Sequence, residues 1–348
     1  MAIGDRIPFA EVAHMVSPNN GLPLIRAHER MDYKRCQKKW YWRWRRGLVP
    51  KAITFSALDL GTWIHDGLSH WYGPGTERAA SLVTWVVRAS NQALNTAQQA
   101  GVAEYVMEEG YKLQSLAQEM SRAYENHYAG DPDVHVIAAE IPLEFELPSA
   151  IHRLKPDLVY RDRDGYVWLM EHKTAGNIST EHLSIDDQAR PYGVMAERAL
   201  RRMGVLKRDD IFKGIMYNYL RKTLPDLREI NAEGKALNKN GTVSARQPAA
   251  QFKRYPVKMT RVAKVIALQR AAAEAFEITG MTERLRDGRL HADGLTKTPH
   301  YSCPRFCQYF SMCSAEEQGT DIRDMERHLY RRENPYTYPE STEEPASW

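Results

Sequence analysis

The feature that most constrains this chain is a β-hairpin predicted near its middle. Two apolar segments rich in β-forming residues, 155–160 and 167–173, lie on either side of the dipeptide Asp164-Gly165. Asp-Gly is one of the strongest sequence signals for a tight hairpin turn, because both residues accept a positive φ readily. We therefore expect an antiparallel strand pair here, around which the rest of the fold is arranged.

The predicted hairpin brings charged side chains together. Strand pairing places Asp157 and Glu171 near one end of the sheet, and strand alternation puts Glu171 and Lys173 on the same face. Two carboxylates and an ammonium group are costly to bury together unless they hold a divalent metal ion or each other. Oxygen ligands of this kind suit Mg²⁺ or Mn²⁺. The pattern is typical of a site that cuts phosphodiesters; an ordinary surface hairpin with a Glu–Lys pair is the alternative.

The pair Pro156-Asp157 followed by Glu171-x-Lys173 resembles the signature of the PD-(D/E)XK nuclease superfamily, and the surrounding motifs resemble its RecB-like branch. The resemblance implies an α/β fold: a restriction-endonuclease-like core with a mixed central sheet flanked by helices, an N-terminal helical region and a C-terminal metal-cluster segment. It also implies that Asp157, Glu171 and Lys173 are catalytic. As a whole, the chain resembles compact stand-alone RecB-like exonucleases of the kind carried by bacteriophages.

The four cysteines predict a second metal site. Cys36 lies near the N-terminus, and the other three form the compact group Cys303, Cys307 and Cys313. In a cytosolic protein such a group favours a metal over disulfides, and four thiolates suit either a 4Fe–4S cluster or a structural zinc ion. Four unrelated buried cysteines are the remaining alternative.

The one-plus-three order of these cysteines resembles the iron–sulfur segment of AddB and of the RecB-like nucleases of CRISPR adaptation. The resemblance implies a 4Fe–4S cluster bound by all four residues. The spacing differs in one respect, since this chain has Cys-x3-Cys-x5-Cys where the family more often has Cys-x2-Cys-x5-Cys. Structural zinc therefore stays open as the alternative.

A histidine upstream of the hairpin is a candidate metal ligand. His65 follows Gly61 in the pattern Gly-x-x-x-His, and the matching histidine of RecB-like nucleases binds the catalytic metal ion. The resemblance implies that His65 joins Asp157 and Glu171 as a ligand, a role that neutral imidazole fills well for Mn²⁺. The backbone carbonyl of His172 is a further candidate. A purely structural histidine is the alternative at position 65.

Gln188 and Tyr192 follow the hairpin at i,i+4 spacing, which places both on one helix face. They resemble the Gln-x-x-x-Tyr motif of the RecB-like branch, whose side chains line the site and contact DNA, and Arg190 between them is a candidate phosphate contact. The alternative is a helix cap and a core tyrosine. Glu140, on the preceding strand, is a possible accessory acid that we do not assign to the site.

A basic and aromatic cluster lies between residues 34 and 46. The chain carries 48 basic and 44 acidic residues, so it is not basic overall, but this segment interleaves seven cations with three tryptophans and a tyrosine. Cations that meet phosphates beside rings that stack on bases are typical of a nucleic-acid channel. The alternative is that the rings lie in the core while the cations are solvated. This packing and DNA binding are compatible with each other. The candidate DNA contacts are Lys38, Lys39 and Arg43.

The predicted organisation is one nuclease domain, 32–313, between an irregular N-terminal segment, 1–31, and a loosely held tail, 314–348. Inside the domain we expect a helical part over 32–130, a catalytic α/β core over 134–220, a loop or β-excursion over 222–254, and a helix with the cysteine triplet over 258–313. The expected helices are 32–46, one starting near 57, 78–98, 102–128, 185–204 and 260–280, and the expected strands outside the hairpin are 134–147 and 214–219.

No apolar run approaches the roughly 20 residues that span a bilayer, and Met1–Arg6 does not have the layout of a secretory signal. We therefore expect a cytoplasmic protein, in the host cytoplasm if phage-encoded, with no membrane partner.

The expected activity is that of a hydrolase, a deoxyribonuclease and in particular an exonuclease, acting on single-stranded DNA or duplex ends in DNA recombination, repair or phage DNA processing. By family resemblance, its partners include a single-strand annealing or recombination protein. A non-cleaving DNA-binding recombination scaffold and a zinc-stabilised RNA-processing nuclease are the alternatives. Exonuclease or endonuclease action, strand polarity, strand preference, one or two catalytic metals and oligomeric state stay open.

Overall fold

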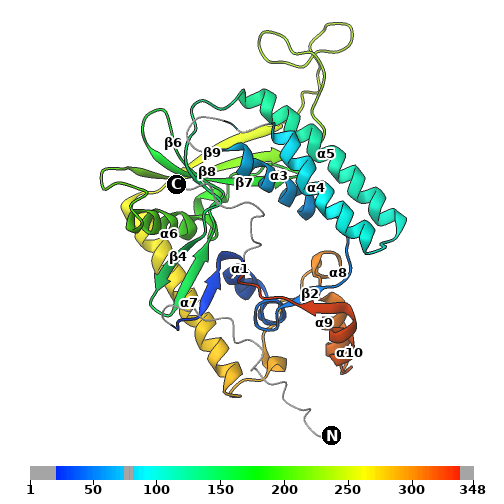
Figure 1. The fold of residues 1–348 in the computed structure, drawn as a ribbon, viewed down its shortest axis with the longest axis vertical. Helices are drawn as coiled ribbons and strands as arrows, with labels where there is room; N and C mark the ends of the chain where they lie inside the picture. Colours follow the sequence, from blue (N-terminus) through cyan, green and yellow to red (C-terminus); the bar gives the residue numbers. More distant parts are fainter. Residues whose placement is uncertain (1–20, 74–77, 79–80, 338–348) are drawn as a thin grey trace. The chain divides into compact units, whose positions relative to one another are not determined.

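The structure is a computed structural model that describes residues 21–73, 78 and 81–337. Within these residues the chain packs as two compact units, each assembled from separate chain segments (Figure 1). The larger unit consists of residues 53–142 and 155–265. The smaller unit consists of the described residues before 53 and after 265, together with 143–154. The predicted 32–313 range contributes to both.

The larger unit is built on a mixed sheet of five strands in the order β3-β6-β7-β8-β9. β7 and β8 run parallel, and every other neighbouring pair in this sheet is antiparallel. The strands are β3 (His135–Ala139), β6 (Leu158–Arg161), β7 (Val167–Ala175), β8 (Phe212–Arg221) and β9 (Phe252–Lys258). The fold class is therefore the predicted α/β class with a mixed central sheet.

The predicted hairpin is present as β6 and β7. Its two strands pair in a register that sets Leu158 opposite Met170. The turn forms because Asp162 Oδ1 accepts the N–H groups of Asp164 and Tyr166 at 3.0 and 2.9 Å, and because Gly165 takes a φ of +84°. β7 lies in the middle of the sheet, which explains why its first six residues are all buried.

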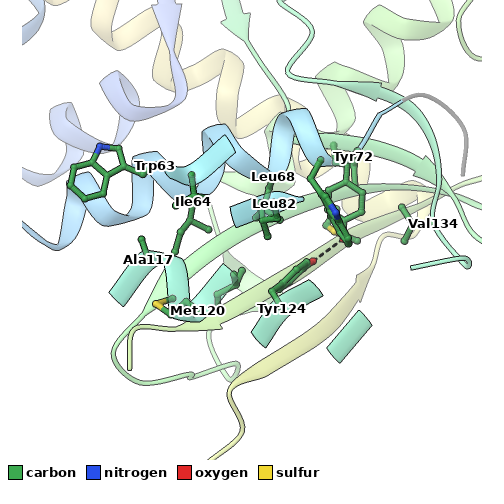
Figure 2. Close-up of a cluster of buried hydrophobic side chains, with 14 of the residues drawn as sticks. Trp63, Ile64, Leu68, Tyr72, Leu82, Ala117, Met120, Tyr124 and Val134 are labelled. Atoms are coloured by element: carbon green, nitrogen blue, oxygen red, sulfur yellow. Dashed lines mark hydrogen bonds between the residues drawn. The ribbon is translucent and has the colours of Figure 1, made fainter. Parts of the chain in front are cut away.

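Three helices pack together beside this sheet: α3 (Ala57–Trp71), α4 (Leu82–Gln99) and α5 (Glu104–Tyr128). Ser56 and Asp59 form a capping box that starts α3. The helices bury an apolar stripe against alternate residues of β6, β7 and β8, and Figure 2 shows part of this core. Its labelled residues include Trp63, Ile64, Leu68, Met120 and Tyr124, and the helices match the predicted ones.

The other face of β8 packs against α6 (Ala189–Arg202), which follows a short 3₁₀ turn over Leu183–Ile185. Because side chains alternate along a strand, Met170, His172 and Asn218 face the α3 side, whereas Glu171 and Lys173 face the other side. The sheet thus divides the polar residues at its centre between two environments.

The smaller unit contains two small sheets and several short helices. One sheet has the order β1-β5-β4, with β1 parallel to β5, and the other pairs β2 with β10.

The predicted 32–46 helix is three short helices, with Cys36 at the first break. The elements are β1 (Leu24–Arg26), α1 (Ala27–Arg35), α2 (Gln37–Trp40), a π-helix (Tyr41–Arg45), β2 (Leu48–Pro50), β4 (Leu143–Leu147), β5 (Ala150–Leu154), a 3₁₀ turn (Ala292–Gly294), α8 (Cys303–Phe306), α9 (Phe310–Glu317), α10 (Arg323–Leu329) and β10 (Tyr330–Arg332). α7 (Arg261–Arg286) starts in the larger unit and continues into the smaller one.

The single strand predicted over 134–147 is two strands in different sheets. β3 ends at Ala139, and β4 begins at Leu143 and pairs with β5, which the prediction missed. The break falls at Glu140, whose φ of +51° is incompatible with a continuing strand, and at Pro142. Apolar residues alternate on both sides of the break, so the sequence pattern is that of one continuous strand.

Both predicted irregular ends are folded where they are described. Residues 21–31 contain β1 and the start of α1, and residues 314–337 contain the end of α9, α10 and β10. Tyr336 is buried, donates to Glu29 Oε2 at 2.7 Å and accepts from Arg45 Nη1 at 2.8 Å. These polar contacts join chain ends that are far apart in sequence, so no local pattern reveals them. Residues 1–20 and 338–348 lie outside the described residues.

Two further expectations concern the loop and the membrane. Residues 222–251 contain only isolated β-bridges and lead into β9, which begins at Phe252 inside the range 222–254 that was expected to be a loop or β-excursion. Among the residues described, none of the helices combines the length and the apolar character that crossing a bilayer requires.

We expect His152, in β5, to make the protein less stable in acid. The side chain is 0% exposed, and burial, with Arg30 and Arg26 nearby, lowers its pKa to about 3. Between pH 6.5 and 3 the unfolded chain binds this proton and the folded chain does not, so stability falls as pH falls, by up to about 1.4 kcal/mol per pH unit. His152→Leu should therefore reduce the stability lost between pH 7 and pH 5 by about 2 kcal/mol, measured by urea unfolding.

The matched control is His291→Leu, which removes an exposed histidine from the same unit. This variant should show the same pH dependence as the unaltered protein. An unchanged dependence in His152→Leu would contradict the assignment.

Candidate active site

The hairpin brings the three predicted catalytic residues together. Asp157 immediately precedes β6, and its Oδ2 accepts the backbone N–H of His172 at 2.8 Å. Lys173 Nζ donates to Glu171 Oε1 at 2.7 Å. The two carboxylates are close enough to influence each other's protonation. The arrangement is thus a mostly buried acid–lysine group at the end of two paired strands.

His65 reaches the same place from α3. Its Nδ1 lies 3.5 Å from Asp157 Oδ2, and its ring meets that of His172 edge to face with centroids 5.8 Å apart. Gly61, one turn earlier, lies against β7: a Cβ there would be 2.9 Å from Thr174 Oγ1. The Gly-x-x-x-His pattern therefore has a physical basis, because the glycine allows the helix approach that brings His65 to Asp157.

Glu140 is a third acidic residue of this group, one that the sequence analysis did not assign. Its backbone N–H donates to the carbonyl of Pro156 at 3.0 Å, which ties it to the segment before β6. Its carboxylate pairs with Lys155 at 2.5 Å and interacts electrostatically with Asp157 and His65. The signal was its acidic side chain directly after a strand, but the positive φ that aims it here is not visible in sequence.

The carboxylates compete for a limited amount of positive charge. Burial raises the pKa of Glu171 despite the ammonium group of Lys173, and burial together with the charge of Asp157 raises the pKa of Glu140 to about 7. Burial acts in the same direction on Asp157, but His65 and the His172 N–H outweigh it, so its pKa lies below the usual range. When His65 is neutral, the three carboxylates of the group face only the ammonium groups of Lys155 and Lys173, and a divalent cation would offset the remaining negative charge.

The carboxylates of the group stabilise the charged forms of Lys173 and His65. Burial alone would lower the pKa of Lys173, but Glu171 more than offsets it and the pKa is raised. Burial likewise disfavours the charged form of His65, and the charges of Asp157, Glu171 and Glu140 reverse the direction and raise its pKa. A protonated His65 therefore supplies positive charge to the same carboxylates that a metal cation would neutralise.

No set of three or more His, Cys, Asp or Glu side chains among residues 21–73, 78 and 81–337 is gathered closely enough to hold a metal ion. At the hairpin the reason is visible: Glu171 is paired with Lys173, and Asp157 with His65. The residue types and their excess negative charge nonetheless fit a hard divalent cation.

The predicted Gln-x-x-x-Tyr residues lie at the start of α6. Tyr192 OH accepts the backbone N–H of Lys155, two residues before Asp157, so the tyrosine supports the segment that carries the aspartate. Gln188 is the N-cap residue of α6 and its backbone N–H donates to Asp186 Oδ1 at 2.6 Å. Arg190 Nη1 donates to the carbonyl of Ser184 at 2.7 Å, a contact within the same segment.

Behind the site a chain of buried hydrogen bonds fixes His172. Asn218 Nδ2 lies 2.8 Å from both His172 Nδ1 and Tyr124 OH. Tyr124 OH lies 2.7 Å from Tyr72 OH, the contact drawn in Figure 2, and Tyr72 OH donates to Asp131 Oδ2 at 2.7 Å. An amide nitrogen only donates, so Nδ1 of His172 accepts and the ring proton is on Nε2.

Arg254, on β9, closes this chain. Its guanidinium donates to Asp131 Oδ1 at 2.8 Å and to Tyr72 OH at 2.9 Å. Burial lowers the pKa of His172 to about 3, so the ring stays neutral. The sequence analysis missed this network because its members are scattered over β7, β8, β9, α5 and the segments that follow α3 and α5. Their main signal was polar residue types inside otherwise apolar segments.

The four cysteines all belong to the smaller unit, and none forms a disulfide. Burial raises the pKa of Cys307, and the neighbouring thiols of Cys303 and Cys36 add to the effect. Burial also raises the pKa of Cys313, with contributions from Cys36 and Cys307. The fold thus brings the distant Cys36 to the triplet, although not at ligand spacing.

The basic and aromatic cluster is largely packed into the smaller unit. Trp40, Trp42 and Trp44 are buried, as the inward-ring alternative predicts. Lys38 is 1% exposed, and its ammonium group pairs with Glu316 at 2.6 Å. Two further cations share one acid: Lys39 and Arg43 lie 2.6 and 3.3 Å from the Asp32 carboxylate. Of the three candidate DNA contacts, Lys38 is the one turned inward.

A mixed sheet whose hairpin carries an acid–lysine group defines a class of metal-dependent nucleases. A family model described as the PD-(D/E)XK nuclease superfamily matches residues 30–314, which is more than half of the chain. The chain belongs to this superfamily. It is accordingly a nuclease, a hydrolase whose substrate is nucleic acid, in a family that generally uses Mg²⁺ or Mn²⁺. A search of curated proteins finds no match.

We expect Gly61→Ala to destabilise the protein, although alanine favours helices. The new methyl group would meet Thr174 Oγ1, and crowding of this kind outweighs a propensity gain of about 1 kcal/mol. Thermal unfolding measures the effect. Adding Thr174→Ala, which removes that oxygen, should restore the stability.

The control is Gly280→Ala in α7, where a Cβ would meet nothing within 4 Å. This variant should be stabilised. Equal stabilisation by Gly61→Ala would show that α3 does not depend on the glycine to approach β7.

Proposed function

We propose that this protein is a metal-dependent deoxyribonuclease, specifically an exonuclease that acts in DNA recombination, repair or phage DNA processing. The observation that carries the nuclease chemistry is the buried group of Asp157, Glu171 and Lys173 at the end of the hairpin. His65 and Glu140 add ligand-type side chains from two other elements. The exonuclease mode and the DNA substrate rest on the resemblance of the ordered motifs to RecB-like exonucleases.

In the proposed mechanism Asp157, Glu171 and His65 would hold the metal ion, and Glu140 and the carbonyl of His172 are further candidate ligands. When bound, Mg²⁺ or Mn²⁺ supplies an acidified water and neutralises charge on the phosphate. Asp157 is ionised at neutral pH because its pKa is depressed. The neutral His172, fixed by Asn218, keeps the backbone N–H that orients Asp157 in place.

Lys173 acts as a hydrogen-bond donor in this mechanism. Its pKa is raised by Glu171, so its Nζ carries a proton throughout the neutral range. An ammonium group orients the attacking water and stabilises negative charge that develops on the phosphoryl oxygens. Since its charge also depends on Glu171, loss of either residue would disturb the other.

The competing functions have weaker support. A non-cleaving scaffold has no need for the Glu171–Lys173 pair, which the buried site keeps at 2.7 Å. An RNA-processing nuclease would use the same catalytic group, so only the choice of substrate separates it from the proposal.

We expect Lys173→Ala and Asp157→Asn to abolish cleavage of end-labelled linear DNA in Mg²⁺ or Mn²⁺, because the first removes the donor and the second a ligand. Rates should fall by at least about 100-fold, the scale on which one charge-stabilising group acts. Lys112→Ala, an exposed lysine of α5, is the matched control and should cleave normally.

Circular DNA and RNA complete this experiment. Resistance of circles would support the exonuclease mode, and the position of the label gives the polarity. Full activity in Lys173→Ala would rule out Lys173 as a catalytic residue. Cleavage of RNA alone would show that the substrate is RNA and not DNA.

We also propose that Cys36, Cys303, Cys307 and Cys313 bind a 4Fe–4S cluster, with structural zinc as the alternative. The support is their gathering in one unit and the presence of cations beside them. The charge of Lys39 lowers the pKa of Cys307, and Lys297 does the same for Cys313, although burial outweighs both. Such cations favour the thiolate form that binds metals.

Cys36→Ser should release the metal and lower the melting temperature. Through the metal, Cys36 would link the early part of the smaller unit to the three cysteines near its end. Protein purified without oxygen should be brown and contain about four iron atoms per chain, and the variant should not. A colourless protein with about one zinc ion would decide for the alternative. A metal-free protein with unchanged melting in Cys36→Ser would rule out both.

A further inference from the structure

The segment between β8 and β9, residues 222–251, extends away from the sheet and is called the arm here. In Figure 1 it is the looped yellow-green segment that reaches beyond the strands of the larger unit. Ala236 and Ser244 are its only buried residues. The arm therefore has almost no hydrophobic core of its own, and its order has to come from other interactions.

The base of the arm is closed. Arg221 N–H donates to the carbonyl of Gln251 at 2.8 Å, and Gln251 Nε2 donates to the carbonyls of Arg221 and Thr223 at 3.0 and 2.9 Å. Lys222 N–H donates to the carbonyl of Ala175 at 2.8 Å. The arm is thus attached to the end of β7 and β8 as a defined projection.

Polar contacts brace the arm internally. Arg228 is held by Asp226, with Nε 2.9 Å from Oδ1 and Nη2 2.5 Å from Oδ2. The same guanidinium reaches across to Ser244 Oγ at 3.0 Å and to the carbonyl of Arg246 at 3.1 Å. Gln247 Nε2 donates to the Ser244 carbonyl at 2.6 Å. Arg228 is therefore a structural brace that joins the two limbs.

The arm leaves the sheet beside the catalytic group. Lys173 is opposite Tyr219 on β8, and Ala175 is opposite Arg221, the last residue before the arm. The base of the arm is thus two residues beyond Lys173, about 7 Å along the strand. A nucleic acid whose phosphate is held at Lys173 must continue past this edge on one side or the other.

The surface of the arm suits such a strand. Lys235, Lys239 and Arg246 are exposed, and among the described residues none of these three side chains enters an ion pair. The arm carries five basic and three acidic residues, and one acid, Asp226, is already matched by Arg228. Cations bind phosphates, and aliphatic side chains pack on bases and sugars. The exposed aliphatic residues are Leu224, Leu227 (90% exposed), Ile230 and Val243.

We propose that the arm is a DNA-binding element that holds the part of the substrate flanking the scissile phosphate. Lys235, Lys239 and Arg246 contact its phosphates, and the exposed aliphatic side chains contact its bases and sugars. The proposal rests on the proposed deoxyribonuclease function and adds a substrate-holding surface outside the catalytic group. Because the contacts are to the backbone, they are independent of base sequence.

Two variants test the arm. One replaces Lys235, Lys239 and Arg246 by alanine, and the other replaces residues 222–250 by Asn-Gly, which the closed base between Arg221 and Gln251 permits. The matched control replaces three exposed cations of the larger unit outside the arm, Lys112, Lys207 and Arg208. Binding is measured in the Lys173→Ala background, where the substrate stays intact, and cleavage in the active protein.

The triple arm variant should bind duplex DNA at least tenfold more weakly, and its salt dependence of log K should be shallower by about 2–3, one unit per lost phosphate contact. The arm-excised variant should lose as much or more. The control should bind like the parent. Hydrolysis of a small chromogenic phosphodiester should be unchanged in the arm variants, since this substrate does not reach beyond the catalytic group.

Unchanged DNA affinity in both arm variants would overturn the proposal. So would a change of oligomeric state with unchanged DNA affinity, because the arm would then be a protein interface. Loss of the small-substrate activity in both variants would assign the arm a structural role instead. A parent protein that binds DNA through the arm but never cleaves it would contradict the deoxyribonuclease function and leave the arm proposal standing.

Discussion

The antiparallel pairing of β6 with β7 is the constraint on which the rest of the larger unit depends. It sets Leu158 against Met170, and so brings Asp157 to the backbone N–H of His172. A shift of one residue would turn Glu171 and Lys173 to the opposite face of the sheet. The Asp-Gly turn and the complete burial of the first part of β7 both hold the register. The position of the acid–lysine group is therefore a property of a strand pair and of the five-residue turn, 162–166, that joins its strands.

The sheet separates two kinds of polar environment around this pair. On the α3 side, His172, Asn218 and Tyr124 form a chain of buried hydrogen bonds that ends at an Arg–Asp pair, although Asn218 Oδ1 has no hydrogen-bond partner among the described residues. On the other side, Glu171 and Lys173 rely on each other. The hydrogen bonds on the α3 side fix the positions of their side chains. On the other side, the Glu171–Lys173 pair keeps two charged groups at the end of the hairpin. One strand, β7, thus carries a hydrogen-bonded network on one face and a charged pair on the other.

Sequence reasoning reached the fold class and the members of the acid–lysine group because their signals are local. A hairpin turn, strand alternation and Gly-x-x-x-His are read within a few residues, and Gly61 has the close packing to explain its presence. The roles of Glu140 and Asn218 could not be predicted from local patterns. The position of Glu140 depends on a left-handed backbone, and that of Asn218 depends on partners 46 and 94 residues away. Folding of the described tail was missed for the same reason: Tyr336 is held by Glu29 and Arg45, near the other end of the chain.

The order of the segments along the chain has a consequence for biosynthesis. All residues of the larger unit precede residue 266, whereas β10 and three of the four cysteines follow it. As the ribosome releases the chain from its N-terminus, the five-stranded sheet has every strand it needs before β2 can find β10 or Cys36 can meet Cys303. The smaller unit, although it contains the first described residues, is the last to be completed. A nascent chain stalled before residue 300 would thus hold a finished sheet and an unpaired β2.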